Sequence, residues 1–455
     1  MSVSKIRKYF GTDGIRGVVG EEPITPEFMM HLGFAAGKVF SKQSSADASG
    51  RAKVLIGKDT RLSGYMLESA LQSGLAAAGV DILLAGPLPT PGVAYLTRVL
   101  RMNAGIVISA SHNPFQDNGV KFFSAEGNKL SDSIELDIEQ HLIKGMDSVI
   151  SEDIGKAKRV VDAVGRYTEF CKSTFPQNCD LSGMRIVLDC AHGATYQVAP
   201  AVFRELGATV IVMGDAPDGT NINLNCGTLY PNALRERVCS EKADIGISFD
   251  GDGDRLTMID ADGTIFDGDQ LLYVIASHRK MPNQGGVVGT LMTNLAIENG
   301  FKALNIPFVR SAVGDRYVYE KLIENRWVLG GEGSGHIICL DKHTTGDGIV
   351  SSLQVLTVLR ERSQSLGQCL SSVDLYPQIL HNLRLKDKLN RGQITEVKTL
   401  GDAAQNRLGP EYRVLIRESG TEPLLRIMVE GQRIDIVQDA IQDLTESIGA
   451  LIDKT

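Results

Sequence analysis

The stretch VLIGKDTRLSGYMLESALQSGLAAAGVDILLA, residues 54–85, contains a complete strand–helix–strand unit. A short β-branched run at residues 54–57 precedes a turn, and apolar residues then recur with helical spacing over residues 64–78. A second apolar run follows at residues 81–85. Strands that alternate with helices pair in parallel through right-handed crossovers, so this stretch predicts an α/β domain.

The same pattern returns twice further along the chain. It reappears between residues 185 and 249 and, in a weaker form, between residues 286 and 330. Each unit has one strand that ends in an unusual loop, which reads SASHNP, DGDGDR or GGEGSGH. Because ligands of open α/β sheets gather at the carboxyl ends of strands, we expect these loops to line one cleft between domains.

The last part of the chain differs from the rest. The pattern breaks near residues 371–378, and the final helix carries one apolar face from Ile434 to Leu451. The predicted fold is therefore α/β, with three similar α/β domains of parallel-rich sheets and a smaller C-terminal α+β domain around a central cleft. The expected domains are residues 1–165 with the serine loop, 166–262 with DGDGDR, 263–376 with GGEGSGH, and 377–455.

The composition argues against several classes of protein. The chain has 455 residues, with 47 basic and 55 acidic side chains and a formal charge of -8, which disfavours a nucleic-acid partner. Its seven cysteines are scattered without a CxxC pair, so neither a disulfide framework nor a zinc site is expected. The N-terminus lacks the apolar core of a signal peptide, and no uncharged run reaches the roughly 18 residues that span a bilayer. We expect a soluble cytoplasmic protein without a membrane partner.

The motif DGDGDR, residues 250–255, is the most informative loop. Asp250, Asp252 and Asp254 repel one another unless a cation neutralises them, and the glycines let all three face one centre. An all-oxygen ligand set of this kind suits Mg²⁺. An EF-hand calcium loop is excluded, because its sixth and twelfth positions would be Arg255 and Ala261. A polar turn with solvated acids is the remaining alternative.

The loop SASHNP, residues 109–114, offers Ser111 as a nucleophile. A helix N-cap is the competing interpretation of this serine. A hydrolase triad is disfavoured, because no GxSxG elbow surrounds Ser111 and the adjacent His112 is not expected to turn back onto its hydroxyl. Phosphoryl transfer needs positioning and charge neutralisation more than a strong base. A phosphorylated Ser111 bridged to the metal of DGDGDR would account for both loops.

Three further loops have the composition of ligand-binding turns. RESGTEP, residues 417–423, combines hydroxyls, N–H groups at a glycine turn and a guanidinium, which favours anion binding. GGEGSGH, residues 330–336, carries alternating polar side chains suited to hydrogen bonds with a sugar, and GTDGIRG, residues 11–17, adds Arg16. Taken alone, each loop is also compatible with an ordinary glycine-rich turn.

Together and in this order, the loops resemble the α-D-phosphohexomutase superfamily. The resemblance covers essentially the whole chain and lies in KYFGTDGIRG, GKDTRLSGYMLESAL, GIVISASHNP, DAVGRY, PDGTNIN, DGDGDR and RESGTEPLLR. It implies that Ser111 carries a phosphoryl group, and that one Mg²⁺ per active site is held by Ser111, Asp250, Asp252 and Asp254. It implies contacts with the sugar from Glu332, Ser334 and His336. It implies contacts with the non-reacting phosphate from Arg417, Ser419, Gly420, Thr421 and Arg426. Positions near the transferring group are implied for Arg16, His112, Lys121 and Arg255.

Within the superfamily the chain is most similar to bacterial members that act on glucosamine phosphates. The implied reaction interconverts glucosamine 6-phosphate and glucosamine 1-phosphate through phosphorylated Ser111 and a glucosamine 1,6-bisphosphate, feeding UDP-N-acetylglucosamine and cell-wall precursor synthesis. Lys121 is favoured over Arg16 for proton movement, because an arginine is a poor base. Glucose or mannose phosphates as substrates, a metal-dependent sugar phosphatase and a non-catalytic sensor are the alternatives. A homodimer, and a kinase or self-phosphorylation acting on Ser111, are left open.

One position departs from the superfamily pattern. Gly333 stands between Glu332 and Ser334, where the superfamily usually has Gln or Met. The extra backbone freedom of glycine is expected to loosen the sugar loop.

Overall fold

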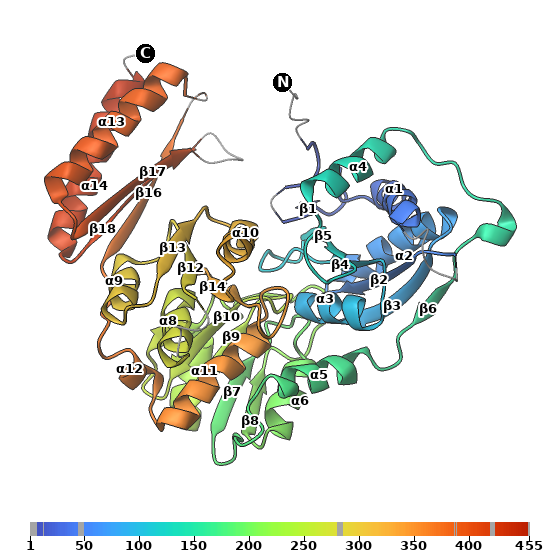
Figure 1. Cartoon of the computed structure of the whole chain (residues 1–455), viewed down its shortest axis with the longest axis horizontal. Coiled ribbons are helices and arrows are strands. Elements are labelled where there is room, and N and C mark those ends of the chain that lie inside the picture. Colours follow the sequence, from blue (N-terminus) through green and yellow to red (C-terminus); the bar gives the residue numbers. More distant parts are fainter. Residues whose placement is uncertain are drawn as a thin grey trace.

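The computed structural model describes residues 7–11, 13–43, 50–279, 285–385, 387, 389–418 and 424–453. Within these residues the chain forms four sheets, of six, five, four and three strands, which follow one another along the sequence. Figure 1 shows the four regions in an arc, with the first and the C-terminal regions at its two ends. The predicted class, three α/β domains and a smaller C-terminal α+β domain, is confirmed.

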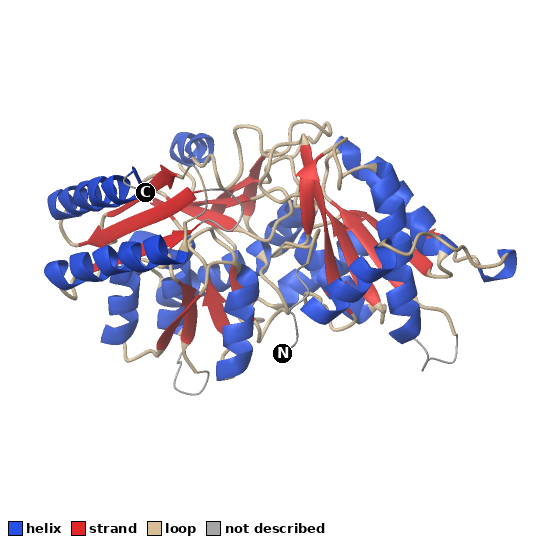
Figure 2. Cartoon of the chain, turned by 90° about the horizontal axis from the view of Figure 1, so that it is seen from above, coloured by secondary structure: helices blue, strands red, loops and turns tan. Residues whose placement is uncertain are grey.

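The first domain is a six-stranded sheet covered by helices (Figure 2). In spatial order its strands are β1 (Ile15–Val18), β5 (Asp117–Ser124), β4 (Ala104–Ile108), β2 (Lys53–Lys58), β3 (Asp81–Pro87) and β6 (Ala157–Arg159). Its helices are α1 (Pro26–Gln43), α2 (Leu62–Ala77), α3 (Thr90–Val99), α4 (Asp132–Leu142) and the short 3-10 helix η1 (Ser151–Asp153). Leu55 and Val107 pack with α3, whereas Val54 and Ile106 pack with α1 and α2. Burial on both faces explains why the central strands are continuous apolar runs.

The second and third domains are built in the same way. The second sheet contains β11 (Ile265–Phe266), β10 (Leu256–Asp260), β9 (Ile245–Phe249), β7 (Arg185–Asp189) and β8 (Thr209–Met213). Its helices are α5 (Ala163–Ser173), α6 (Val198–Glu205) and α7 (Asn232–Glu241). The third sheet contains β13 (Phe308–Ser311), β12 (Val287–Thr290), β14 (Leu329–Gly331) and β15 (Ile337–Cys339). Its helices are α8 (Gly268–His278), α9 (Leu295–Ala303), α10 (Asp315–Asn325), α11 (Gly348–Arg362) and α12 (Leu366–Cys369).

The C-terminal domain is an antiparallel sheet with two long helices. Its strands are β16 (Gln378–Arg384), β18 (Leu424–Gly431) and β17 (Tyr412–Glu418), and its helices are α13 (Arg391–Leu408) and α14 (Ile434–Asp453). The domain has a hydrophobic cluster of its own, whereas one continuous cluster joins parts of the first three domains. Hydrogen bonds such as Arg413 Nη2 to the Thr293 carbonyl (3.1 Å) connect it to the third domain.

The first three sheets share one four-strand topology. The equivalent orders are β3-β2-β4-β5, β8-β7-β9-β10 and β13-β12-β14-β15. In each, the first two pairings are parallel and the last is antiparallel. The internal repeat that the sequence suggests is therefore present in the topology.

The sequence pattern missed the antiparallel fourth strand of each repeat and several helices, among them α11. The loops that follow β4, β9 and β14 are too short for a crossover helix, so the chain must return as an antiparallel strand. The strands β7, β8 and β9 lie within residues 185–249, where the strand–helix pattern predicts the second α/β unit. The helix α11 was not predicted, because it is buried around most of its circumference and so lacks an apolar stripe.

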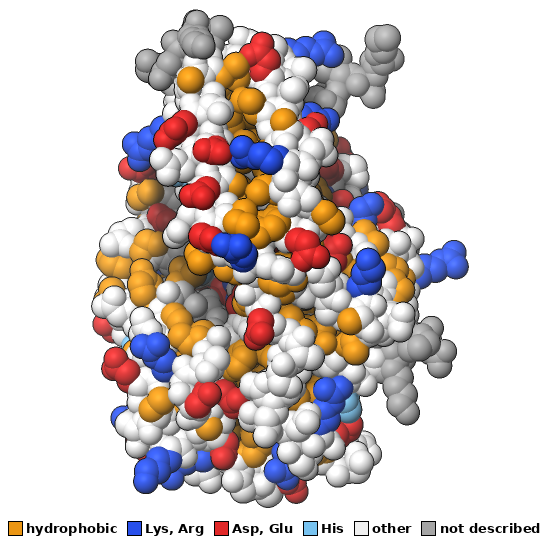
Figure 3. Space-filling view, turned by 90° about the vertical axis from the view of Figure 1, so that its left-hand side faces the viewer, with side chains coloured by type: hydrophobic (Ala, Val, Ile, Leu, Met, Phe, Trp, Pro, Cys, Tyr) orange, Lys and Arg blue, Asp and Glu red, His pale blue; other side chains and the backbone are white. Residues whose placement is uncertain are grey.

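The described surface carries charges of both signs (Figure 3), as the nearly balanced counts of acidic and basic residues predict. Figure 3 shows acidic and basic side chains intermixed on the face formed by the third and C-terminal domains. Among the described helices, none combines the length and the apolar character that a membrane crossing requires.

Candidate active site

Three loops meet at one point of the molecule, and each has the same place in the repeated topology. They follow β4, β9 and β14, and each leads into the antiparallel strand of its own sheet. Ser111 of the first loop donates a hydrogen bond to Asp250 of the second (2.6 Å). His336 of the third loop lies 3.7 Å from Asp254. The repeat thus brings three different kinds of side chain to one centre.

Ser111 is buried, and its backbone is in the left-handed region with a φ of 55°. This conformation is unfavourable for a residue with a Cβ atom and clusters at functional sites. The Ser111 hydroxyl lies 2.6 Å from Oδ2 of Asp250 and 3.2 Å from Nδ1 of His112. The expectation that His112 does not turn back is therefore wrong, because the left-handed turn carries the next side chain to the same side. The N-cap interpretation also fails, since the loop leads into β5 and not into a helix.

The three aspartates of the second loop form a buried acidic cluster. One ligand atom from each carboxylate lies within 4.8 Å of the others. Oδ1 of Asp252 and Oδ1 of Asp254 are buried without a hydrogen-bond partner. Because the three side chains are buried, the alternative of a solvated polar turn is wrong. Partnerless carboxylate oxygens around one centre are the ligands that a hard divalent cation takes, so the cluster fits a divalent metal.

The acidic cluster also changes the protonation of its own members. Burial, and then the negative charges of Asp252 and Asp254, hold the pKa of Asp250 well above its usual range. Burial disfavours the charge on Asp254 too, but Lys121 and His336 outweigh it and hold the pKa of Asp254 well below its usual range. The protein's own cations therefore neutralise one side of the cluster, and Asp250 on the other side stays short of positive charge.

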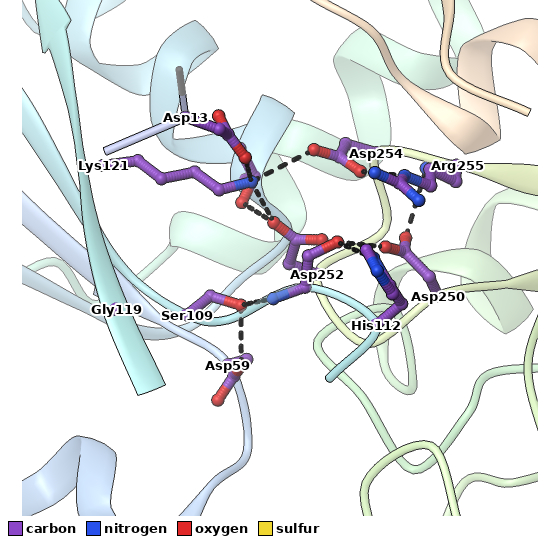
Figure 4. A network of polar contacts seen from close by, with 12 residues as sticks. Asp13, Asp59, Ser109, His112, Gly119, Lys121, Asp250, Asp252, Asp254 and Arg255 are labelled. Carbon is purple, nitrogen blue, oxygen red and sulfur yellow. Dashed lines mark hydrogen bonds and ion pairs between the residues drawn. The ribbon is translucent and has the colours of Figure 1, made fainter. Parts of the chain in front are cut away.

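Lys121 is a buried cation that the sheet aims at the aspartates. It lies on β5 opposite Val107 of β4, and its Nζ is 2.9 Å from Asp252 and 3.2 Å from Asp254. Figure 4 shows the lysine reaching the carboxylates from the strand, with Asp13 beside its amine. Burial disfavours its charge, but Asp13, Asp252 and Asp254 hold the pKa of Lys121 well above its usual range. Lys121 is therefore protonated in this arrangement and supplies positive charge.

Two arginines and His112 complete the polar surroundings of Ser111. The backbone N–H of Arg255 donates to Oδ1 of Asp250 (3.1 Å), and Arg16 on β1 pairs with Asp13. Burial, and then the positive charges of Arg255 and Arg16, lower the pKa of His112 to about 4. The imidazole is thus neutral at neutral pH and can accept a proton.

The three polar residues of the GGEGSGH loop point in different directions. Glu332 accepts the N–H of Gly314 (2.9 Å), and Ser334 is exposed. His336 is buried between Asp254 (3.7 Å) and Asp315 (3.6 Å). Burial disfavours the charge on His336, but Asp254 and Asp315 raise its pKa to about 9. His336 therefore faces the acidic loop as a cation.

Gly333 lies in a loop that main-chain hydrogen bonds hold on both sides. Its carbonyl accepts the N–H of Gly268 (3.1 Å). The Glu332 N–H donates to the His336 carbonyl (3.0 Å). The nearest atoms that a Cβ atom at position 333 would meet belong to Asp269, at an ordinary contact distance of 3.4 Å. The expectation that the glycine loosens the loop stays a prediction.

Arg417 and Arg426 lie directly opposite each other on β17 and β18 of the C-terminal domain. Like charges at such positions destabilise a sheet unless an anion lies between them. Burial, and then the charge of Arg426, lower the pKa of Arg417, and Nε of Arg426 is buried without a hydrogen-bond partner. Within the described residues, neither arginine forms a hydrogen bond or ion pair with the Ser111 cluster. The predicted phosphate contacts Ser419, Gly420 and Thr421 lie outside the described residues.

Four residues beside the cluster were not predicted from the sequence. Thr90 donates to Oδ2 of Asp252 (2.6 Å). Lys129 bridges Asp13 (2.5 Å) and Asp315 (2.5 Å), which connects the first domain to the third. Asp13 stands in GTDGIRG and could have been noticed there. The other three are single polar residues on ordinary elements, and only the fold reveals their position.

Family models match the chain in four consecutive segments. They describe phosphoglucomutase/phosphomannomutase α/β/α domain I at residues 7–148, domain II at 165–263, domain III at 267–376 and the C-terminal domain at 380–447. The chain belongs to the phosphoglucomutase/phosphomannomutase family. The domain boundaries predicted after residues 165, 262 and 376 stay predictions, because a family match delimits similarity and not a folding unit.

Several phosphoglucosamine mutases are similar to this chain over nearly its whole length. The phosphoglucosamine mutase of Nitrosospira multiformis is 59% identical over 445 residues, which cover 97% of this chain and 96% of that protein. A family member from Burkholderia thailandensis matches in structure with a TM-score of 0.81 at 22% identity, covering 96% of this chain and 97% of that one. The N-acetylphosphoglucosamine mutase of Aspergillus fumigatus, in complex with GlcNAc-6P and magnesium, matches with a TM-score of 0.67 at 16% identity over 100% of this chain and 97% of that one.

Proposed function

We propose that the chain is a phosphoglucosamine mutase, an isomerase that interconverts glucosamine 6-phosphate and glucosamine 1-phosphate. The observation that carries the proposal is the 2.6 Å contact between the Ser111 hydroxyl and Asp250, within a cluster of three buried aspartates. A hydroxyl held against a metal-type site is placed to carry a phosphoryl group. The choice of glucosamine is supported by the 59% identity with the Nitrosospira enzyme.

The reaction consists of two opposite transfers. Phosphorylated Ser111 gives its phosphoryl group to the free hydroxyl of the sugar phosphate. The bond between phosphorus and the serine oxygen breaks, a bond to the sugar oxygen forms, and the proton of the sugar hydroxyl is released while Ser111 regains one. The product, glucosamine 1,6-bisphosphate, reorients and returns its other phosphoryl group to Ser111 by the reverse step. The bisphosphate is thus the proposed intermediate, and it is also proposed as an activator.

We infer that the cofactor is one Mg²⁺ per site, held by Asp250, Asp252, Asp254 and an oxygen on Ser111. The buried oxygens of Asp252 and Asp254 that lack a hydrogen-bond partner support this assignment. The Aspergillus protein of the same fold in complex with magnesium is consistent with it. When bound, Mg²⁺ offsets negative charge on the transferring phosphoryl group.

The chain's own side chains supply charge and handle the proton. Lys121 and Arg255 pair with carboxylates of the acidic cluster, and Arg16 pairs with Asp13 beside Lys121. These cations are proposed to stabilise a loose, anionic transition state. His112 is the neutral acceptor, with Nδ1 lying 3.2 Å from the Ser111 oxygen. Carboxylate partners keep Lys121 protonated in this arrangement, and the role in proton movement expected for Lys121 stays a prediction.

The substrate is proposed to bind across the domains. Glu332, Ser334 and His336 line the sugar position from the third domain, and the opposed arginines 417 and 426 hold the non-reacting phosphate. Ser419, Gly420 and Thr421 are proposed to complete the phosphate cradle. The proposed partner is a small sugar phosphate, and the proposed activity belongs in the cytoplasm, where it feeds UDP-N-acetylglucosamine synthesis. Dimerisation and the source of the first phosphoryl group on Ser111 stay predictions.

A direct assay tests the substrate. With Mg²⁺ present, the purified protein is offered the 6-phosphates of glucosamine, glucose and mannose, and formation of each 1-phosphate is measured. We expect kcat/KM for glucosamine 6-phosphate to be at least about 10-fold higher than for the other two. The reason is that the site must distinguish the amine at the second carbon of glucosamine from the hydroxyl that glucose and mannose have there. A faster reaction with glucose or mannose phosphate would instead indicate a phosphoglucomutase or phosphomannomutase. Release of inorganic phosphate without isomer would indicate a phosphatase.

The opposed arginines are expected to act on binding. Arg417→Ala and Arg426→Ala should each raise KM roughly 10- to 100-fold with a smaller change in kcat, because each removes a charge-assisted hydrogen bond to phosphate. Steady-state kinetics measures both constants. Arg407→Ala is the matched control, since Arg407 is an exposed arginine of the same domain paired with Asp443 (3.1 Å). An unchanged KM in both test variants would contradict the phosphate assignment.

A further inference from the structure

Arg61, in the motif GKDTRLSG, has no role in the proposed chemistry, yet its large side chain is fully buried. Its guanidinium has five N–H groups, and the structure provides an acceptor for each. Nε donates to Oδ2 of Asp59 (2.8 Å). The other acceptors are main-chain carbonyls of the loop that carries Ser111, those of Ser111 (3.0 Å), Asn113 (2.9 Å), Asp117 (3.1 Å) and Pro114. Because every donor of this buried cation is paired, moving the loop would break hydrogen bonds to a buried charge. Arg61 therefore restrains the main chain of the loop.

The partner of Arg61 holds the other side of the same loop. Oδ2 of Asp59 accepts the hydroxyl of Ser109 (2.7 Å), and Oγ of Ser109 accepts the backbone N–H of Ser111 (2.9 Å). Figure 4 shows Asp59 and Ser109 linked on the side of the loop away from Arg255. The N–H and the carbonyl of Ser111 are therefore both tied, directly or through Ser109, to one buried ion pair.

The second domain also forms hydrogen bonds with the main chain of the loop that carries Ser111. Nδ2 of Asn223, in the segment between β8 and α7, donates to the carbonyls of Ser111 (2.9 Å) and Asn113 (3.0 Å). Asn223 is itself buried and fixed, because its backbone N–H donates to the Ala191 carbonyl (2.9 Å). The same domain carries Asp250, so these contacts fix Ser111 relative to the aspartate that meets its hydroxyl.

We propose that Arg61 is a positioning residue for phosphoryl transfer, with Asn223 as its counterpart on the second domain. A left-handed serine persists only where its surroundings over-determine it, and these donors supply that constraint at its main chain. The side chains of Arg61 and Asn223 bind the main-chain carbonyl of Ser111 and not its hydroxyl. Their effect on the reaction is therefore to position Ser111. The inference deepens the proposed function and rests on it.

The test compares Arg61→Lys and Asn223→Ala with a matched control, Arg279→Lys. Lysine keeps the charge but gathers three donors on one atom, so it cannot span the four carbonyls. We expect Arg61→Lys to lower kcat about 100-fold with KM changed less than about threefold, and Asn223→Ala to lower kcat about 10-fold. Hydrogen-exchange mass spectrometry should show faster exchange in the peptide spanning residues 109–117 in both variants. Arg279, which donates to Asp341 (2.8 Å) in the third domain, should change neither readout when replaced by lysine.

The outcomes separate the inference from the proposed function. If Arg61→Lys matches Arg279→Lys in both kcat and exchange, the inference is overturned. If Arg61→Lys does not fold, Asn223→Ala decides, and unchanged kcat and exchange in that variant overturn the inference. A wild type without mutase activity overturns the proposed function and the catalytic part of the inference. Faster exchange in Arg61→Lys would still establish that Arg61 restrains the loop that carries Ser111.

Discussion

Replacing Ser111 with alanine is expected to abolish isomerisation, lowering kcat by about 10⁴-fold or more, while the protein stays folded. The change removes the oxygen that would carry the phosphoryl group and that lies 2.6 Å from Asp250. The fold should survive, because Ser109, Arg61 and Asn223 hold the main chain at this position and alanine keeps the Cβ atom. Circular dichroism checks the fold, and a coupled assay measures kcat.

The neighbouring serine of the same loop is the matched control for this experiment. Ser109→Ala removes two hydrogen bonds around the loop but leaves Ser111 in place, so we expect a loss of only about 10-fold. Intact-mass measurement should find one phosphoryl group on the wild type and on Ser109→Ala, and none on Ser111→Ala. Near-normal turnover by Ser111→Ala would contradict the phosphoserine mechanism, whatever the substrate.

Much of the site could be predicted from the sequence because its chemistry is local. Three aspartates alternating with glycines at the end of an apolar strand define a metal loop without reference to the rest of the chain. The serine loop was recognised in the same way. The repeated strand–helix pattern also predicted that such loops would meet, because each one ends a strand at the same edge of its sheet.

What the sequence could not show depends on contacts between distant residues. Arg61 looks like an ordinary surface cation beside Asp59, and only the fold reveals that its guanidinium reaches carbonyls 50 or more residues away. The backbone turn that brings His112 onto the Ser111 hydroxyl is likewise invisible, because periodicity carries no information on a single φ angle. Lys129 and Asp315 meet across two domains, and no local pattern distinguishes them from solvated charges.

The equivalence of the three loops explains why one architecture supports this chemistry. Each repeat presents a tight loop between its third strand and its antiparallel fourth strand, and only the residues in the loop differ. The first loop carries the serine proposed to accept the phosphoryl group, the second carries the carboxylates, and the third carries the polar groups proposed to contact the sugar. A repeated scaffold can thus assemble a composite site from parts that are far apart in the chain.

Asp252→Asn is expected to lower kcat on the order of 10³-fold and to weaken Mg²⁺ binding strongly, because a bound metal contributes several kcal/mol to the transition state. Oδ2 of Asp252 already accepts Thr90 (2.6 Å) and Lys121 (2.9 Å), so asparagine can keep those contacts through its carbonyl oxygen. The atom lost is the buried, partnerless Oδ1, which we assign to the metal. Steady-state kinetics and calorimetric titration with Mg²⁺ measure the two effects.

Chelation of the wild type separates the metal's contribution from any effect of the substitution on packing. Treatment with EDTA should reduce turnover to the level of Asp252→Asn, and added Mg²⁺ should restore the wild type but not the variant. Asp262→Asn is the matched control, because Asp262 is an exposed aspartate in the next turn of the chain and accepts the N–H of Thr264 (2.8 Å), away from the acidic cluster. It should keep both its turnover and its response to Mg²⁺. Full activity in the chelated wild type would show that Lys121 and the neighbouring arginines neutralise the transferring phosphoryl group on their own, and the three buried carboxylates would then need another explanation.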